Sequence, residues 1–217
     1  MGAIILSPVL ILLACAVYGV VHSWLASMQA KDLAGNWLGA SVMERYYRVA
    51  YNIFAVLSFL PVLALPVWLP DQLLYRIPMP WIWLTLGIQG LAALTLSIGL
   101  LQTGPMDFAG LRQLFGPADN RPAELVTGGL YRYVRHPLYT AGIVILWFSP
   151  VMSVNLAALF AGLSAYLVIG AIFEERKLAR QYGQVYLDYR RTTPMLIPGI
   201  LIPGISIPGS QGKKNKV

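Results

Sequence analysis

The sequence predicts an all-α fold, a polytopic bundle of about five membrane-spanning helices with a C-terminal helical hairpin. Hydrophobic residues make up 57% of the chain and charged residues only 12%, half of the roughly 25% typical of soluble domains. The mean hydropathy is +0.63, and apolar runs near the ~20 residues that cross a bilayer recur along the chain. The cations behind the net charge of +7 lie between these runs, so membrane orientation explains them without a nucleic-acid partner.

Five apolar runs are the expected spans. They cover residues 4–21, 47–69, 81–101, 139–152 and 155–173. Trp24, Trp81 and Trp83 lie at the ends of such runs, where aromatic belts meet the membrane interface. Pro61 and Pro66 fall inside the second run, so a kink or a break is expected there.

The last two spans are separated only by residues 150–155, which predicts a tight helical hairpin. The first arm is short for a full crossing, so we expect it to begin inside the protein, near His136. A hairpin brings its two outer ends to the same side of the membrane. His136, before the first arm, and Glu174, after the second, are therefore expected to be neighbours.

The remaining segments have distinct compositions. Residues 25–46 are expected to form a polar loop, and residues 102–135 a polar loop too long to be a bare connector. Residues 174–192 carry apolar side chains at three- and four-residue spacing, as in an amphipathic helix at the membrane interface. Residues 196–217 repeat Ile-Pro-Gly and end in lysines, which predicts a flexible tail.

The positive-inside rule orients this arrangement. With five spans, every Lys and Arg except Arg76 falls on the side of the C-terminus, which places that side in the cytoplasm and the N-terminus outside. Cys15 is the single cysteine and is expected to be a small buried hydrophobe. It permits no intramolecular disulfide, and no cluster of His, Cys and Asp predicts a metal site. The lack of disulfides and the simple topology favour a prokaryotic plasma membrane.

Polar side chains gather in two places, residues 128–139 and residues 174–189. They could be ordinary interface residues that contact lipid phosphates and water. Two features favour a functional site instead. Glu174 directly follows an apolar span, where an unpaired carboxylate is costly. His136 precedes Pro137 at an expected helix start, where backbone N–H groups point towards an anion.

The spaced motifs of this region resemble the superfamily of isoprenylcysteine carboxyl methyltransferases and phospholipid methyltransferases. The resemblance covers residues 108–195. Its motifs are Gly129-Leu130-Tyr131-x-x-x-Arg135-His136-Pro137-x-Tyr139, Glu174-Glu175-x-x-Leu178, Tyr182-Gly183, Tyr186-x-x-Tyr189 and Thr193-Pro194. The N-terminal half is similar to the nurim-like branch, which includes NnrU-type proteins and methanethiol S-methyltransferases. That similarity rests on His22-Ser23-x-x-Ala26-Ser27, Tyr47-Arg48-x-x-Tyr51-Asn52 and Phe108-x-Gly110-Leu111-Arg112-Gln113.

The resemblance implies a single integral membrane methyltransferase domain over residues 1–195 and a cytoplasm-facing pocket for S-adenosylmethionine. The pocket would not be a Rossmann site, since the chain has no Gly-x-Gly-x-x-Gly motif. By position in the family pattern, the residues implied to bind the cofactor are Gln113, Glu124, Leu125, Val126, Tyr131, His136, Pro137, Leu138, Tyr139 and Glu174.

The acceptor is less defined. Carboxyl methyltransferases of this superfamily carry an acceptor-binding arginine where this chain has Gly170, so the resemblance favours another acceptor, with a thiol sulfur leading. A thiol with a pKa near ~8.5 needs only modest activation. Arg135 could favour the thiolate, and His136, Glu174 or Glu175 could accept the proton; the sequence does not choose among them.

Three other functions remain open. They are lipid N-methylation, prenylcysteine carboxyl methylation and a non-catalytic nurim-like membrane protein. The expected partners are a small or lipid-like methyl acceptor and membrane lipids. His22 with Ser23 fits a helix-end polar pair as well as a site, and Arg45 and Arg48 fit interface anchors.

Overall fold

The protein is mostly helical, as the sequence predicts. A computed structural model describes residues 2–103, 106, 111, 114 and 125–200. Its elements are α1 (Gly2–Ala26), α2 (Met28–Leu38), α3 (Ala40–Trp68), β1 (Leu73–Arg76), α4 (Ile82–Thr103), η1 (Gly129–Arg132), α7 (Pro137–Trp147), β2 (Val151–Ser153), α8 (Val154–Tyr182) and α9 (Gln184–Thr192).

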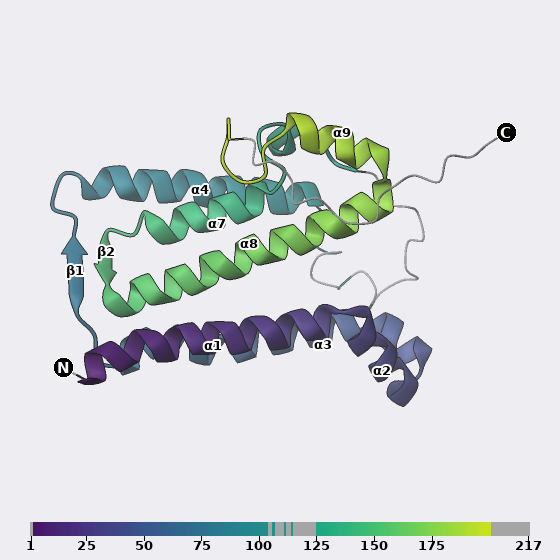
Figure 1. Cartoon of the computed structure of the whole chain (residues 1–217), viewed down its shortest axis with the longest axis horizontal. Helices are drawn as coiled ribbons and strands as arrows, with labels where there is room; N and C mark the ends of the chain where they lie inside the picture. Colours follow the sequence, from purple (N-terminus) through teal and green to yellow (C-terminus); the bar gives the residue numbers. More distant parts are fainter. Residues whose placement is uncertain (1, 104–105, 107–110, 112–113, 115–124, 201–217) are drawn as a thin grey trace.

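The long helices run roughly parallel to one axis (Figure 1). Helix α8 packs most extensively against α1, while α7 packs against α4 and α1 against α3. The Gln89 side chain of α4 donates to the Ile145 carbonyl of α7 at 2.7 Å. The N-terminus lies at one end of the molecule and α9 at the other (Figure 1).

Four helices of the described chain are long and apolar enough to cross a membrane. These candidate spans are Ile5–Ala26, Arg45–Trp68, Ile82–Gln102 and Val154–Tyr182. The fourth expected span, residues 139–152, is instead the 11-residue helix α7. At ~1.5 Å per residue it covers about half of a ~30 Å hydrocarbon core. The predicted hairpin is present, because α7 and α8 pack together and Trp147 Nε1 donates to Ser164 Oγ at 2.9 Å.

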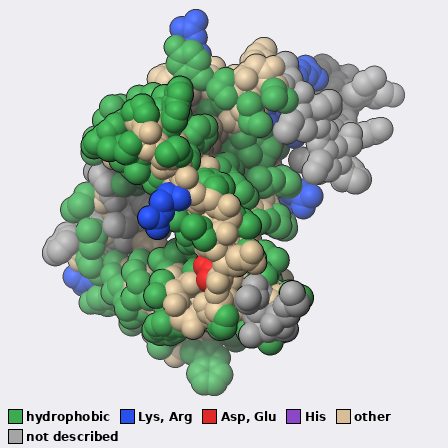
Figure 2. Space-filling model, turned by 90° about the vertical axis from the view of Figure 1, so that its left-hand side faces the viewer, with side chains coloured by type: hydrophobic (Ala, Val, Ile, Leu, Met, Phe, Trp, Pro, Cys, Tyr) green, Lys and Arg blue, Asp and Glu red, His purple; other side chains and the backbone are tan. Residues whose placement is uncertain are grey.

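A small antiparallel sheet, which the all-α prediction missed, closes one end of the molecule. Strands β1 and β2 pair across 75 residues of chain, with Arg76 opposite Val151. Asp71 Oδ1 accepts the N–H of Asn155 at 3.0 Å, and the fully buried Asn155 side chain donates to the Leu69 carbonyl. Figure 2 looks onto this end and shows hydrophobic side chains over most of the visible surface.

The polar loop expected at residues 25–46 is wrong. This segment contains α2 and the start of α3, and Ser27 caps α2 by accepting the N–H of Ala30. Polar composition alone does not prevent a capped helix from forming. Helix α3 also continues through Pro61 and Pro66, so the alternative of a break there is wrong as well.

The amphipathic helix expected at residues 174–192 is divided in two. Helix α8 continues to Tyr182, and Gly183, at φ +56°, turns the chain into α9. Only glycine adopts this conformation at low cost. The turn lays α9 back beside the end of α8, where the two helices pack.

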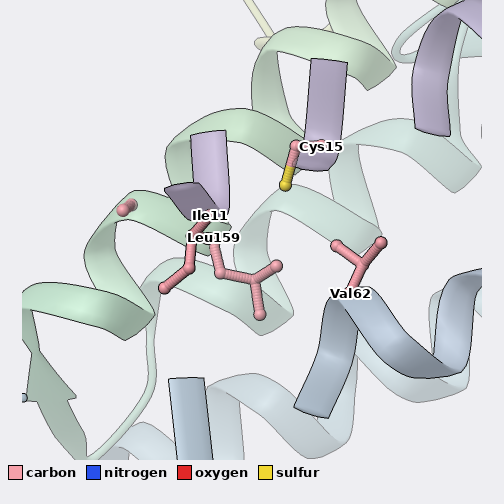
Figure 3. Packing of buried hydrophobic residues seen from close by; sticks show 5 residues of the cluster. Ile11, Cys15, Val62 and Leu159 are labelled. Atoms are coloured by element: carbon pink, nitrogen blue, oxygen red, sulfur yellow. The ribbon is translucent and has the colours of Figure 1, made fainter. Parts of the chain in front are cut away.

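Figure 3 shows the main core between α1, α3 and α8. Its buried residues are Ile11, Cys15, Val62, Ala158 and Leu159. Helices α1 and α8 approach closely, since a Cβ built on Gly162 would lie 2.8 Å from the Cβ of Cys15. The expectation that Cys15 is a small buried hydrophobe is confirmed. Most large apolar side chains outside this core are exposed, as membrane-spanning helices that face lipid require.

Candidate functional site

A buried ion pair joins the two polar regions of the sequence. Arg135 and Glu175 are both buried, and Arg135 Nε donates to Glu175 Oε1 at 2.6 Å. Arg135 Nη1 also donates to the carbonyls of Arg190 and Thr193. One guanidinium thereby ties together the segment before α7, the end of α8, and α9. These bonds compensate the cost of removing both charges from water.

The chain after α9 covers the start of α7. The N–H groups of Arg135 and His136 donate to the carbonyls of Pro194 and Met195 at 2.8 and 3.1 Å. Thr140 Oγ1 donates to the carbonyl of Leu196 at 2.7 Å. The N–H of His136, at the helix start where the sequence analysis expected N–H groups to face an anion, is therefore used within the protein.

His136 and Glu174 are neighbours, as the hairpin predicts. His136 Nδ1 lies 3.6 Å from Glu174 Oε2, and Tyr139 donates to the same carboxylate oxygen at 2.9 Å. The rings of His136 and Tyr139 stack with centroids 5.3 Å apart. The other ring nitrogen, Nε2, lies 3.4 Å from Glu175 Oε1. Each nitrogen of this buried ring thus faces a different carboxylate.

The two carboxylates differ in exposure. The side chain of Glu175 is 10% exposed and that of Glu174 is 45% exposed. Glu175 is neutralised by Arg135, whereas Glu174 presents its charge at the surface of the cluster. Glu174 is therefore the group that can meet a cationic ligand.

Tyr131 is brought to the same place by η1. Gly129 begins this turn at φ +60°, and a Cβ there would lie 2.7 Å from Gln102 Nε2. Burial, followed by the charge of Glu174, raises the pKa of Tyr131. The hydroxyl of Tyr189 donates to the carbonyl of Tyr131. Tyr131 therefore stays a neutral phenol, held beside Glu174.

Helix α9 contributes two tyrosines to this cluster, Tyr186 and Tyr189, which the sequence analysis placed in a family motif but gave no role in the site. Tyr186 is 1% exposed, and burial, with the charge of Glu175, raises its pKa although Arg135 opposes the shift. Burial likewise raises the pKa of Tyr189 to about 12. The Tyr-x-x-Tyr spacing was the sequence signal that could have pointed to Tyr186 and Tyr189. The turn at Gly183, which positions these two tyrosines, was not predicted.

The predicted residues Tyr131, Arg135, His136, Tyr139 and Glu174 thus come together. Pro137 is buried at the first position of α7. Leu138 packs on Gly99 of α4, where a Cβ built on the glycine would lie 2.7 Å from Cδ2 of Leu138. Leu125 and Val126 are described just before η1, Leu125 partly buried and Val126 exposed. Two predicted cofactor residues, Gln113 and Glu124, lie outside the described residues.

A second polar cluster lies between α1, α3 and α8. The hydroxyl of Tyr51 and His22 Nε2 are 2.6 Å apart. Tyr18 stacks on the His22 ring at 5.5 Å, and Tyr166 meets it edge-on at 5.8 Å. His22, which the sequence analysis paired with Ser23, therefore belongs to an aromatic cluster. Arg45 is elsewhere and donates to the carbonyl of Leu114 at 3.0 Å.

Comparisons with known proteins match this chain to methyltransferases. Residues 83–185 match the phospholipid methyltransferase family. The methanethiol S-methyltransferase of Crocosphaera subtropica is 28% identical over 85% of this chain and 72% of its own length. Those of a Pseudomonas species and Mycobacterium tuberculosis are 31% and 27% identical, over 90% and 84% of this chain and 74% of each relative. No solved structure matches. The superfamily resemblance is confirmed.

Proposed function

The chain belongs to the family of the methanethiol S-methyltransferases, and from that membership we propose that it transfers a methyl group from S-adenosylmethionine to a small alkanethiol. The enzyme class, a methyltransferase with membrane-spanning helices, follows from the family and from the four long apolar helices. The observation that carries the finer proposal is the half-exposed carboxylate of Glu174, held beside His136 and Tyr139.

The side chains of the His136–Glu174 cluster fit the charges of the proposed methyl donor. S-adenosylmethionine supplies a methyl group on a positively charged sulfur and carries an ammonium group. Glu174 offers an exposed negative charge at one end of the cluster, while Glu175 is already paired with Arg135. Tyr131 and Tyr139 lie beside Glu174 as phenols that can donate or accept. We assign these groups, with His136, to donor binding.

Arg135 has a positioning role in this proposal. Arg135 is 5% exposed, and its guanidinium donates to Glu175 and to two carbonyls. That Arg135 favours a thiolate stays a prediction. Its contacts support a role in holding α9 and the covering segment 193–196 against the start of α7. The cofactor contacts predicted for Leu125, Val126, Gln113 and Glu124 stay predictions.

An apolar thiol suits the acceptor side better than a carboxylate does. A Cβ built on Gly170 meets no atom of the described residues within 4 Å, so among these residues this face of α8 offers space where the carboxyl methyltransferases carry their arginine. The relatives named above are methanethiol S-methyltransferases. Methyl transfer is an in-line displacement, in which alignment of donor and acceptor alone can lower the barrier by ~7–11 kcal/mol.

The same proposal includes an orientation. Among the described cations, only Arg76 lies at the end that carries β1, and the others lie towards the end that carries α2 and α9. The positive-inside rule then places the His136–Glu174 cluster on the cytoplasmic side, where the methyl donor is available.

The direct test uses purified protein in detergent with methyl-labelled S-adenosylmethionine. Methanethiol, an amino-headgroup phospholipid and farnesylcysteine are offered separately as acceptors, and calorimetry measures binding of the donor. We expect saturable donor binding and label in dimethyl sulfide. Label in the phospholipid or in farnesylcysteine would replace the thiol with that acceptor. If S-adenosylmethionine does not bind, the protein is a non-catalytic membrane protein and the proposed enzyme is rejected.

A further inference from the structure

Three residues line one face of α8 between the two polar clusters. Tyr166, Gly170 and Glu174 are spaced by four and therefore lie along the same side of the helix. Tyr166 contacts the His22 ring, and Glu174 accepts from Tyr139. Gly170, between them, leaves space that no described residue fills. Tyr166 is also close enough to Tyr139 for the two phenols to interact electrostatically. The two clusters therefore border a common region over Gly170.

His22 is held in that region with one ring nitrogen available. Tyr51 engages Nε2 at 2.6 Å, while Nδ1 is buried and has no hydrogen-bond partner among the described residues. Ser23 hydrogen-bonds the phenol of Tyr166, whose ring closes on His22. A buried nitrogen without a partner is unfavourable unless a ligand or solvent completes it. None of the described residues assigned to the methyl donor uses this nitrogen.

The surroundings of His22 suit an apolar acceptor. Tyr18, which stacks on His22, also lines an apolar groove of about 420 Å³ between α1 and α3. Val17 and Val21 line the same groove and are exposed on the membrane-spanning surface of α1. A small thiol dissolved in the bilayer therefore meets an apolar surface that leads to the His22 cluster.

We propose that His22 is the catalytic residue that takes the proton of the acceptor thiol, over the open face at Gly170. This deepens, and rests on, the proposed thiol methyltransferase function. In the reactive tautomer Nε2–H donates to the Tyr51 oxygen, and the lone pair of Nδ1 faces the thiol. The S–H proton moves to Nδ1, and the sulfur forms a bond to the methyl carbon. The bond from that carbon to the donor sulfur breaks, and its electron pair stays on the sulfur of S-adenosylhomocysteine.

His136 is less suited to this task. Its two nitrogens lie 3.6 and 3.4 Å from Glu174 and Glu175, and its side chain is 5% exposed. We therefore assign His136 to the methyl donor and His22 to the thiol acceptor. The two histidines are the only ones in the chain, so each can be observed without interference from others.

The test compares two thiols of similar size and different acidity, ethanethiol and the more acidic trifluoroethanethiol. We expect His22→Gln to lower kcat for ethanethiol by about 10²–10⁴-fold, the usual contribution of a general base. The loss should be much smaller for the fluorinated thiol, which ionises without help, and calorimetry should give an unchanged Kd for S-adenosylmethionine. Equal losses for both thiols, or no loss, would overturn the assignment. A wild type that methylates no thiol would instead reject the proposed function itself.

A second measurement uses the unmutated protein, in case His22→Gln does not fold. Histidine labelled at Cε1 gives two NMR signals, assigned with His136→Gln. In the presence of S-adenosylhomocysteine, ethanethiol should shift the His22 signal, whereas S-adenosylhomocysteine alone should shift that of His136. A thiol that moves only the His136 signal, or neither signal, would contradict the proposal.

Discussion

Arg135 and Glu175, forty residues apart in the chain, form a buried ion pair at 2.6 Å. Glu174, the preceding residue, is instead half-exposed and bonded to Tyr139. Consecutive glutamates at the end of one helix therefore face different surroundings. The first can act on a ligand, and the second holds the protein together.

Removing either partner of the buried pair should destabilise the protein strongly. Glu175→Gln leaves the Arg135 charge buried and unpaired, which typically costs ~3–5 kcal/mol in the free energy of unfolding. The control is Asp188→Asn, which breaks the exposed pair with Arg191 (side chains 59% and 75% exposed) and should cost under ~1 kcal/mol. Thermal unfolding in detergent compares the two variants. Similar Tm values would show that the buried pair does not hold α9.

Replacing Glu174, unlike replacing Glu175, should weaken donor binding and leave the stability nearly unchanged. Glu174→Gln keeps the size of the side chain and removes the charge that we assign to the methyl donor, so donor binding and methyl transfer should fall by at least ~10-fold, the equivalent of 1.4 kcal/mol. The Tm should change little, because the side chain is half-exposed. Calorimetry and the labelled-methyl assay measure both effects. Unchanged turnover in a folded Glu174→Gln protein would remove Glu174 from the site.

The neighbourhood of His136 and Glu174 was predictable because it depends on local signals. Two apolar runs with a short break specify a hairpin, and a hairpin aligns its ends whatever its detailed packing. The Pro137 helix start followed from the same reading. These inferences needed no contact between segments outside the hairpin.

Contacts between distant segments were not predictable in the same way. The pairing of β1 with β2 depends on strands of four and three residues, which carry almost no periodic signal. The bonds from Arg135 to the carbonyl of Thr193 and from Tyr189 to the carbonyl of Tyr131 use backbone acceptors. Every residue has such an acceptor, so side-chain identity does not reveal which one is used.

Gly129 should be the glycine that positions Tyr131. Gly129→Ala combines a positive φ with a Cβ 2.7 Å from the Gln102 amide, and should cost about 1–2 kcal/mol and weaken donor binding. Gly128→Ala is the matched control, since Gly128 has φ −93° and a Cβ there meets nothing within 4 Å. Unfolding and calorimetry are measured for both. Equal effects would mean that the turn is not what holds Tyr131.

Filling the space over Gly170 should block the acceptor and leave the fold intact. Gly170→Leu places a side chain where no described atom lies within 4 Å of the new Cβ, and leucine favours a helix by about 0.8 kcal/mol over glycine. Methyl transfer to ethanethiol should fall by at least ~10-fold, while the Kd for the donor stays the same. Gly90→Leu in α4 is the control, because its Cβ is equally unobstructed. Full thiol turnover by Gly170→Leu would place the acceptor elsewhere.

Two C-terminal deletions should separate the covering segment from the predicted tail. Removing residues 193–217 takes away the carbonyls that accept from Arg135, His136 and Thr140, together with the buried Met195 and Leu196. That deletion should lower the Tm and abolish methyl transfer, because buried donors at the start of α7 are left unpaired. Removing only residues 201–217, part of the flexible tail predicted over residues 196–217, should leave both unchanged. Loss of activity from the shorter deletion would extend the functional domain beyond residue 200.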